Sequence, residues 1–508
     1  MQKTEVLIIG AGPTGLVLAL WLTKIGVKVR IIDKAEKAGT TSRALVIHAR
    51  NLEFYHQMGI DQVPLKEGVQ INALSFWVGG KKAGHVPFGN IKANISPYQY
   101  MLDYPQDRQE EMLEKELANL GMRVERKTEL ISFEQMPGGG IRAQILKPNG
   151  EKEECEAIYL AGCDGARSVV REQMSVGFPG GTYEETFYVA DVITKGSLTP
   201  GEINIALDRA DFLATFPINS SGEIRLVGAI RLEAMGRKDL KWEDVSGGIL
   251  DSLKLEVEEV KWFSTYRVHH RVASHFREGS VFLLGDAGHI HSPVGGQGMN
   301  TGIGDAVNLA WKLGAVIKDN ANPKILDTYE PERIAFAKKL VATTDGAFAF
   351  VSARGAFSTW VRIHIVPHLL PWLFRFTRIR RFLFRTVSQT LIKYSQSALS
   401  EGSAGKLKGG DRLPWVKAET GPDNFASLTT MKWQVHIYGE TSASLQTLCN
   451  ERGIKLNIFQ WNAAVKTAGF QKNAIYIIRP DGYIGLAAPN ADLQKINAYF
   501  DKCGITGI

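Results

Sequence analysis

The sequence has few cysteines and no long apolar runs, and each shortage excludes a class of protein. Its 508 residues include four cysteines, which form neither a CxxC pair nor a metal-ligand spacing. We therefore predict no metal site, and we interpret the thiols as reduced and the protein as cytoplasmic. No uncharged apolar run reaches the roughly 18 residues of a membrane-spanning helix. The cysteines are Cys155, Cys163, Cys449 and Cys503.

Acidic residues are missing from residues 346–400, which carry eight basic residues. The net charge of +7 would fall to −1 without these eight, so the excess belongs to one segment and no nucleic-acid partner is predicted. At helical spacing Trp372, Phe376, Ile379 and Leu383 share a face, and arginines gather on the other side. This pattern suits an anionic membrane surface, the protein's own core or a partner subunit.

A glycine-rich fingerprint opens the chain. An apolar strand over residues 4–9 leads into GAGPTG, a helix ending near Gly26 and a second strand over residues 27–32. This order, followed by an acidic residue, is typical of a dinucleotide-binding unit whose helix N-terminus attracts phosphate. Asp33 is predicted to accept hydrogen bonds from ribose hydroxyls. The predicted contacts are Gly10, Gly12, Pro13, Thr14, Gly15, Asp33 and Lys34.

A second glycine-rich loop lies in residues 283–313, LLGDAGHIHSPVGGQGMNTGIGDAVNLAWKL. An apolar strand runs into Gly285 and Asp286, and further glycines lead to an amphipathic helix. Such a loop presents free backbone N–H groups to an electron-rich ligand. The carboxylate of Asp286 is placed to hold a sugar or polyol hydroxyl.

The remaining segments predict the domain organisation. We expect a helix over residues 103–120 and a strand over 122–133. Short alternating segments over 178–272 predict an antiparallel sheet, and such a sheet can wall an apolar pocket. Plausible lining residues are Phe212, Phe216, Pro217 and Arg225.

We predict an α/β and α+β protein. A Rossmann-type domain spans residues 1–177 and 273–400, and its last part, 346–400, is helical and basic. The antiparallel sheet of residues 178–272 is inserted into it. Residues 401–410 are predicted to be a linker, and 411–508 a small α/β domain without a redox cysteine pair.

Four motifs in fixed order carry a family resemblance: GAGPTG, SRALVIHARNLE (42–53), GCDGARSVVR (162–171) and the 283–313 loop. Together they resemble the class A flavin-dependent aromatic hydroxylases of the para-hydroxybenzoate hydroxylase type. The pieces YEPER, GDRLP and IIRPDGYIG further resemble the longer phenol and polyketide hydroxylases. The resemblance implies an FAD-binding Rossmann domain, an inserted substrate sheet and a thioredoxin-like C-terminal domain.

The resemblance implies roles for four polar residues. Arg43 matches an arginine that contacts the FAD phosphates, and Gln106 a glutamine that reaches the ribityl or pyrophosphate portion. Asp164 lies in the family's DG motif, which is associated with FAD and NAD(P)H. Asp286 matches the aspartate that holds the ribityl chain.

The resemblance also places the flavin ring. Pro293 would lie at its reacting edge, and Gly298, Met299 and Asn300 would direct backbone N–H groups toward its pyrimidine side, where a helix N-terminus stabilises negative charge. The chain departs from the family pattern at Gly288, where alanine is more frequent, and at Gly304, where glutamine or methionine is. Both are small-residue packing positions.

The implied reaction is NAD(P)H-dependent hydroxylation of a small aromatic substrate by O2 through a flavin C4a-hydroperoxide. Baeyer–Villiger insertion or epoxidation is an alternative on the same fold, and a non-catalytic flavin-binding or membrane-surface protein is an alternative of another class. His48, His289 and His291 are candidates for a base, but none is assigned. Either a monomer or a homodimer is compatible with the sequence.

Overall fold

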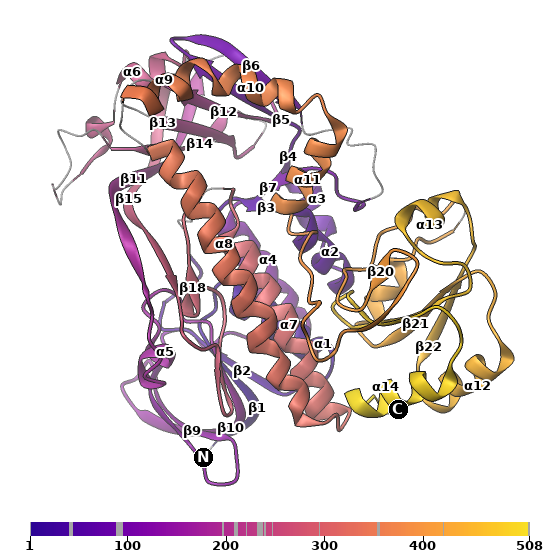
Figure 1. Ribbon diagram of the computed structural model, residues 1–508. Helices are drawn as coiled ribbons and strands as arrows, with labels where there is room; N and C mark the ends of the chain where they lie inside the picture. Colours follow the sequence, from indigo (N-terminus) through magenta and orange to yellow (C-terminus); the bar gives the residue numbers. More distant parts are fainter. Residues whose placement is uncertain are drawn as a thin grey trace.

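The computed structural model describes residues 2–39, 44–87, 95–195, 198–207, 212–219, 221–230, 237, 240–245, 247–293, 295–352, 356–419 and 421–505. Figure 1 shows a lower part with a parallel sheet, an upper part with a second sheet, and a C-terminal part on the right. The long helix α8 (Tyr329–Ser352) runs from the lower part to the upper one.

The first sheet has a parallel centre. Its order is β16-β17-β10-β1-β2, with a hairpin of β8 and β9 added beside β10. The central strand β1 is fully apolar from Val6 to Ile9 and buried there, as expected for a strand covered on both faces. The strands are β1 (Gln2–Ile9), β2 (Val29–Ile32), β8 (Glu129–Gln135), β9 (Ile141–Leu146), β10 (Lys152–Gly162), β16 (Arg277–Glu278) and β17 (Val281–Leu283).

Helices and a small sheet surround this core. Helix α1 packs against α7 and α4, and this places both glycine-rich loops at the carboxyl ends of the parallel strands. The helices are α1 (Pro13–Lys24), α2 (Ala49–Met58), α3 (Gln62–Glu67), α4 (Gln106–Asn119), α5 (Val169–Gln173) and α7 (Gly298–Lys318). The three-stranded sheet consists of β3 (Val46–Ile47), β7 (Met101–Asp103) and β4 (Val69–Ile71).

The second sheet has eight strands in the order β18-β15-β11-β14-β13-β12-β5-β6. It extends the sheet predicted over residues 178–272, because residues 73–87 join its edge and β5 pairs in parallel with β12. Alternation along a strand identifies the strand but not the sheet that it joins. The strands are β5 (Ala73–Val78), β6 (Lys81–Pro87), β11 (Gly180–Lys195), β12 (Glu202–Leu207), β13 (Phe212–Pro217), β14 (Glu223–Ala229), β15 (Glu256–Val272) and β18 (His289–Ile290), and α6 covers Gly247–Asp251.

The C-terminal part is thioredoxin-like. Its core strands follow the order β24-β23-β21-β22, in which β21 and β22 are parallel and β23 is antiparallel to both neighbours. Its elements are β21 (Gln434–Tyr438), α12 (Ala443–Glu451), β22 (Lys455–Phe459), α13 (Ala463–Ala468), β23 (Ile475–Ile478), β24 (Ile484–Ala488) and α14 (Leu493–Cys503).

The predicted linker over residues 401–410 is instead a hairpin of this sheet. Strand β19 (Glu401–Ala404) pairs in parallel with β24, and β20 (Leu407–Lys408) folds back on it. Gly402 and Gly405 have φ values of 69° and 62°. The glycine content therefore serves tight backbone turns rather than a flexible connection.

Two predicted element boundaries also differ. The helix expected over residues 103–120 begins at Gln106, because Pro105 precedes it and a proline disfavours the helical conformation of the residue before it, here Tyr104. The strand expected from residue 122 begins only at Glu129. Lys127, with a φ of 51°, stands in a turn before it.

The basic segment forms three short helices, α9 (Ala356–His364), α10 (Val366–Leu373) and α11 (Thr377–Val387). Helix α10 packs on β6 so closely that a Cβ at Gly84 would overlap the Pro367 carbonyl oxygen. None of the helices in the described ranges is both long and apolar enough to cross a bilayer.

Candidate cofactor and substrate cavity

A cavity of about 1130 Å³ lies between the two sheets. Residues from the first turn of α1, the loop after β17 and the start of α7 line one side. Apolar residues of the eight-stranded sheet and the inner face of α11 line the other side. We call these the cofactor side and the substrate side.

The α1 fingerprint shapes the cofactor side. A Cβ at Gly10 or Gly15 would overlap a backbone carbonyl oxygen, that of Cys163 or of Gly10, so both glycines are needed for close packing. Gly12 is different, since a Cβ there would meet no atom of the chain within 4 Å. Gly12, Pro13 and Thr14 line the cavity, and α1 has no side-chain cap.

The acidic residue after β2 supports this turn from behind. Asp33 accepts hydrogen bonds from the backbone N–H groups of Ala11 at 2.6 Å and Ala35 at 2.7 Å. Asp33 is not among the residues that line the cavity, and Lys34 is exposed. Arg43 lies outside the described residues.

The other two predicted polar contacts face different neighbours. Gln106 lines the cavity and donates a hydrogen bond to Glu110 at 2.8 Å. Asp164 accepts from the Ser168 hydroxyl at 2.6 Å and from the Val170 N–H at 3.2 Å, at the start of α5. Burial raises the pKa of Asp164 although these hydrogen bonds oppose the shift. Neighbouring Cys163, not Asp164, lines the cavity.

A buried ion pair holds the loop that carries Asp286. Asp286 itself is exposed to the cavity. Asp305 accepts hydrogen bonds from the Gly285 N–H at 3.0 Å and from Arg333 Nε at 2.6 Å, and it lies 2.7 Å from Nε2 of His289. Burial would raise the pKa of Asp305, but Arg333 and His289 hold it below its ordinary value.

The sequence analysis missed Asp305 and Arg333. Both are at most 2% exposed, and a Cβ at Gly304 would lie 3.1 Å from Arg333 Nη2. The available signal was the single acidic residue of a mostly apolar helix, since a buried charge needs a partner. The small residue at 304 therefore makes room for the arginine.

The start of α7 is fixed by one side chain. Asn300 is fully buried and donates to the carbonyl oxygens of Val46 and Gly296, both at 2.8 Å, while it accepts from the His48 N–H. Gly298 and Met299 line the cavity. The N–H groups of residues 298–300 belong to the open first turn of the helix.

The three candidate histidines have different surroundings. His48 is fully buried with Nε2 2.8 Å from the Gly295 carbonyl oxygen, and burial lowers its pKa to about 4. His289 is held by Asp305. His291 lines the cavity beside Pro293, and burial lowers its pKa to about 4 as well. Only His291 of the three lines the cavity.

The substrate side is largely apolar. Its walls include Phe216, whereas Pro217 is not among the lining residues and the side chain of Phe212 is outside the described part. Arg225 lines the cavity, forms a bidentate pair with Asp191 at 2.7 Å and donates to the Ala44 carbonyl oxygen. The apolar lining residues include Leu74, Phe187, Val189, Ile203, Val227, Trp262, Ile290, Phe374, Leu383 and Phe384.

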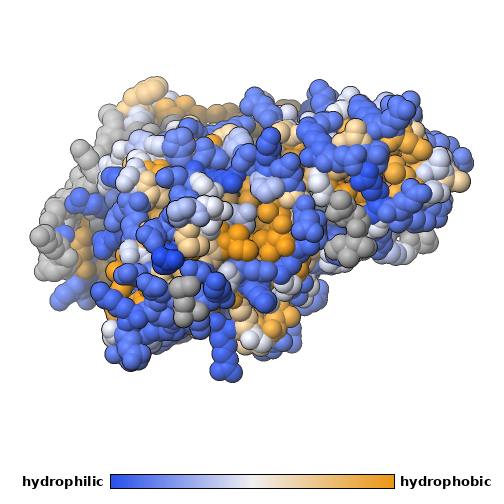
Figure 2. All heavy atoms as spheres, turned by 90° about the horizontal axis from the view of Figure 1, so that it is seen from below, coloured by the Kyte–Doolittle hydropathy of each residue, from blue (hydrophilic) through white to orange (hydrophobic). Residues whose placement is uncertain are grey.

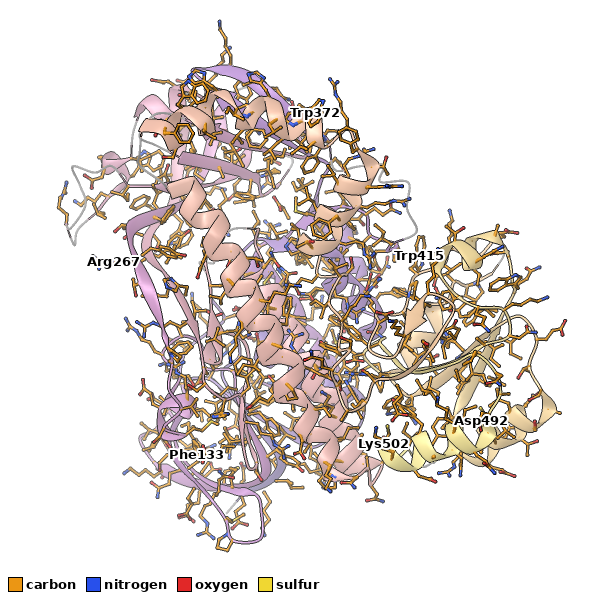
Figure 3. All side chains as sticks on the ribbon, in the orientation of Figure 1. Phe133, Arg267, Trp372, Trp415, Asp492 and Lys502 are labelled. Atoms are coloured by element: carbon orange, nitrogen blue, oxygen red, sulfur yellow. The ribbon has the colours of Figure 1, made fainter. Side chains whose placement is uncertain are left out.

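Two further cations line the substrate side. Arg267 lies on the long strand β15 (Figure 3). Arg380 reaches the cavity from α11, and its buried Nε has no hydrogen-bond partner in the described structure. The residues that line this cavity include one acidic residue, Asp286, which lies on the cofactor side.

FAD fits the cofactor side. A dinucleotide needs an uncapped helix N-terminus and open backbone beside it, and α1 with Gly12 supplies both. Beside Pro293, the hydroxyl of Ser292 is buried and has no hydrogen-bond partner among the described residues. Asp286 and the first turn of α7 add hydrogen-bonding groups along the same side.

Comparison with known proteins identifies the family. Residues 3–344 match the FAD binding domain family. The chain is 33% identical to 6-methylpretetramide 4-monooxygenase of Streptomyces rimosus over 97% of this chain and 92% of that protein. It is 32% identical to pentachlorophenol 4-monooxygenase of Sphingobium chlorophenolicum over 69% of this chain and 65% of that protein. The structure of OxyS anhydrotetracycline hydroxylase from Streptomyces rimosus matches with a TM-score of 0.79, 26% identity and full coverage of both chains.

The chain belongs to this FAD-binding family and is a flavin-dependent aromatic monooxygenase. The fold and the family predicted from the four motifs are thereby confirmed. The non-catalytic alternative and the Baeyer–Villiger or epoxidation alternative are not favoured by these relatives.

Proposed function

We propose that this enzyme hydroxylates a polycyclic or phenolic aromatic compound with FAD, NADH or NADPH, and O2. The observation that carries the proposal is one continuous cavity with a dinucleotide groove on one side and apolar walls on the other. FAD, when bound, supplies the redox and oxygen-transfer chemistry. The chain's own residues bind it, orient the substrate and exclude water.

For the cofactor side we propose the following roles. The backbone at Gly12 and Thr14 binds the pyrophosphate, and Asp286 binds the ribityl hydroxyls. Pro293 packs at the reacting edge, and residues 298–300 stabilise negative charge with their N–H groups. Gln106 faces the same side and is available to the cofactor, while Asp33 orders the turn through Ala11.

For the substrate side, the relatives indicate the class of compound. One acts on 6-methylpretetramide and another on pentachlorophenol. A mostly apolar cavity suits an aromatic ring system, and Arg380 and Arg267 suit a phenolate or other acidic group on it. We also propose a cytoplasmic location, since the cysteines of the described residues are free thiols. A monomer or a homodimer remains the proposed oligomeric state.

We propose three structural units for this function. An FAD-binding unit comprises residues 1–177 without 73–87, together with 273–400. A substrate unit comprises residues 178–272 with the β5–β6 hairpin. The C-terminal unit comprises residues 401–508. Strand pairing supports the assignment of residues 73–87 to the substrate unit and of residues 401–410 to the C-terminal unit.

The test is the visible spectrum of the purified protein, followed by NADH and NADPH oxidation with a panel of phenols and polycyclic quinones. We expect a flavin spectrum and oxidation stimulated by at least one aromatic compound, with a product heavier by one oxygen atom. Protein that cannot be reconstituted with FAD would contradict the proposal. Flavin-loaded protein that no aromatic compound stimulates would contradict the proposed substrate class.

The variant Asp286→Ala tests the proposed site. We expect weaker FAD retention, because a charge-assisted hydrogen bond contributes about 1.5–3 kcal/mol. Asp501→Ala removes an exposed carboxylate of the C-terminal part and serves as the matched control. Full flavin content in Asp286→Ala would overturn the role assigned to that residue.

A further inference from the structure

The exposed apolar side chains of this protein are concentrated on three consecutive helices. In the described residues, every exposed phenylalanine or tryptophan lies between residues 357 and 382, and Phe357 is 78% exposed. We call this surface of α9–α11 the outer face. It consists of Phe357, Trp360, Leu369, Trp372, Phe376 and Phe382.

The inner sides of α10 and α11 are already occupied. Val366, Leu370 and Phe374 pack against the eight-stranded sheet, on Phe76 and Val86. Further along, α11 turns its apolar residues to the cavity. Helices α10 and α11 are therefore held in place by their inner sides, and their exposed aromatic residues are not required for this packing.

The segment that forms the outer face carries charge of one sign. Arg375 and Arg378 are exposed beside Trp372 and Phe376, and no acidic residue occurs between Asp345 and Glu401. In the described part of the chain, neither of these two arginines has an ion-pair partner. Exposed aromatic residues flanked by arginines complement the apolar interior and anionic headgroups of a lipid surface.

The outer face occupies one part of the molecular surface. Figure 1 places α9 and α10 along the upper edge of the molecule, and Trp372 is labelled there in Figure 3. Figure 2 shows the molecule from below, where hydrophilic residues dominate and the apolar area near the centre is small. The helices α9 and α10, which carry most of the exposed aromatic residues, thus lie on the side opposite the face seen in Figure 2.

We propose that the outer face of α9–α11 binds the surface of an anionic lipid bilayer. The aromatic side chains enter the boundary between headgroups and acyl chains, while the arginines contact lipid phosphates. Helices α9 and α10 lie along the membrane surface, since each is too short to cross the bilayer. This inference is independent of the substrate and of turnover.

The experiment is co-sedimentation of the full-length, flavin-loaded protein with vesicles of phosphatidylcholine alone or mixed with phosphatidylglycerol. We expect binding to the anionic vesicles, at least about tenfold weaker binding to the neutral ones, and weakening by high salt. Equal binding to both vesicle types, or no binding to the anionic ones, would overturn the proposal.

Matched variants locate the binding surface. Trp372→Ser with Phe376→Ser should weaken vesicle binding about tenfold or more. The control is Ile458→Ser. The Ile458 side chain is 51% exposed, nearly the same as Trp372 at 52%, but it lies on β22, so the substitution should leave vesicle binding unchanged. Retained flavin absorbance shows that each variant is folded. Unchanged binding of the double variant would overturn the assignment.

A charge pair of variants completes the test. Arg375→Gln with Arg378→Gln should weaken binding and its salt dependence, whereas Lys417→Gln with Lys472→Gln, both exposed on the C-terminal part, should not. Light scattering without vesicles tests whether a second copy of the chain covers the outer face instead. A dimer that the Trp372 and Phe376 substitutions dissociate, without vesicle binding, would make the outer face an interface between two copies and overturn the membrane proposal.

Discussion

The cofactor side of the cavity consists mainly of backbone groups and glycines, whereas the substrate side consists of apolar side chains. Gly12 and the first turn of α7 contribute main-chain atoms, and Asp305 and Arg333 fix the loop behind Asp286. On the substrate side, residues such as Phe216 come from separate strands and from α11. The first side depends on a rigid local geometry, and the second on the size of each side chain.

The largest effect should come from breaking the buried ion pair of the cofactor side. Asp305→Ala leaves Arg333 buried without its carboxylate, and we expect the free energy of unfolding to fall by about 3–5 kcal/mol. Chemical denaturation measures this. Asp327→Ala removes the exposed partner of Arg277 and should cost below about 1 kcal/mol. Equal losses in the two variants would contradict the role of burial.

Lowering the pH should also destabilise the protein through a residue of the cofactor side, His291. Burial holds the pKa of His291 at about 4, below 6.5, so the unfolded chain binds more protons between these pH values. Stability is therefore fully present above pH 6.5 and is lost as the pH falls toward 4, by about 3 kcal/mol for this residue. Denaturation of His291→Gln should show a smaller loss, while His368→Gln, on the exposed surface, should behave as the wild type.

A smaller and more selective effect is expected at Gly12. Gly12→Ala meets no atom of the chain, so the fold should be unchanged. The added methyl group occupies the space proposed for the pyrophosphate, and FAD affinity should fall about tenfold or more, equivalent to about 1.4 kcal/mol. Flavin titration measures this. Gly346→Ala, which also meets nothing, is the control; equal affinities would contradict the proposed position of the cofactor.

The smallest effect should come from the substrate side. Phe216→Ala enlarges the cavity without touching the cofactor side, so the flavin spectrum should remain. We expect KM to change up to about tenfold, and in different directions for small phenols and for polycyclic compounds. This corresponds to about 1.4 kcal/mol, which lies in the lower part of the range of about 1–3 kcal/mol for one pocket contact. Steady-state kinetics on both classes decide, and a uniform loss of kcat would show that the two sides are not separable.

The same contrast explains what the sequence could predict. The glycine fingerprints have a fixed spacing because backbone geometry requires it, so the strand–loop–helix order of the α1 turn and of the 283–313 loop could be predicted. The lining of the substrate side has no spacing rule, and core residues have the same composition. Of the plausible lining residues, Phe216 and Arg225 line the cavity, whereas Pro217 does not.

Strand pairs and ion pairs between distant parts of the chain could not be predicted either. No local signal indicates that residues 73–87 join the eight-stranded sheet, or that residues 401–410 add a hairpin to the C-terminal sheet. The buried pair of Asp305 and Arg333 is separated by 28 residues and forms only when α7 and α8 pack together. These features depend on tertiary structure rather than on sequence pattern.

The C-terminal part shares buried charges with the rest of the chain. Arg479 donates two hydrogen bonds to Glu332 of α8 at 2.8 and 3.0 Å, and Arg412 pairs with Glu53 of α2. All four side chains are at most 8% exposed. A chimera that combines this part with the first 400 residues of a relative must therefore keep the matching carboxylates and arginines together. Buried ion pairs therefore join the two parts, even though each has its own sheet.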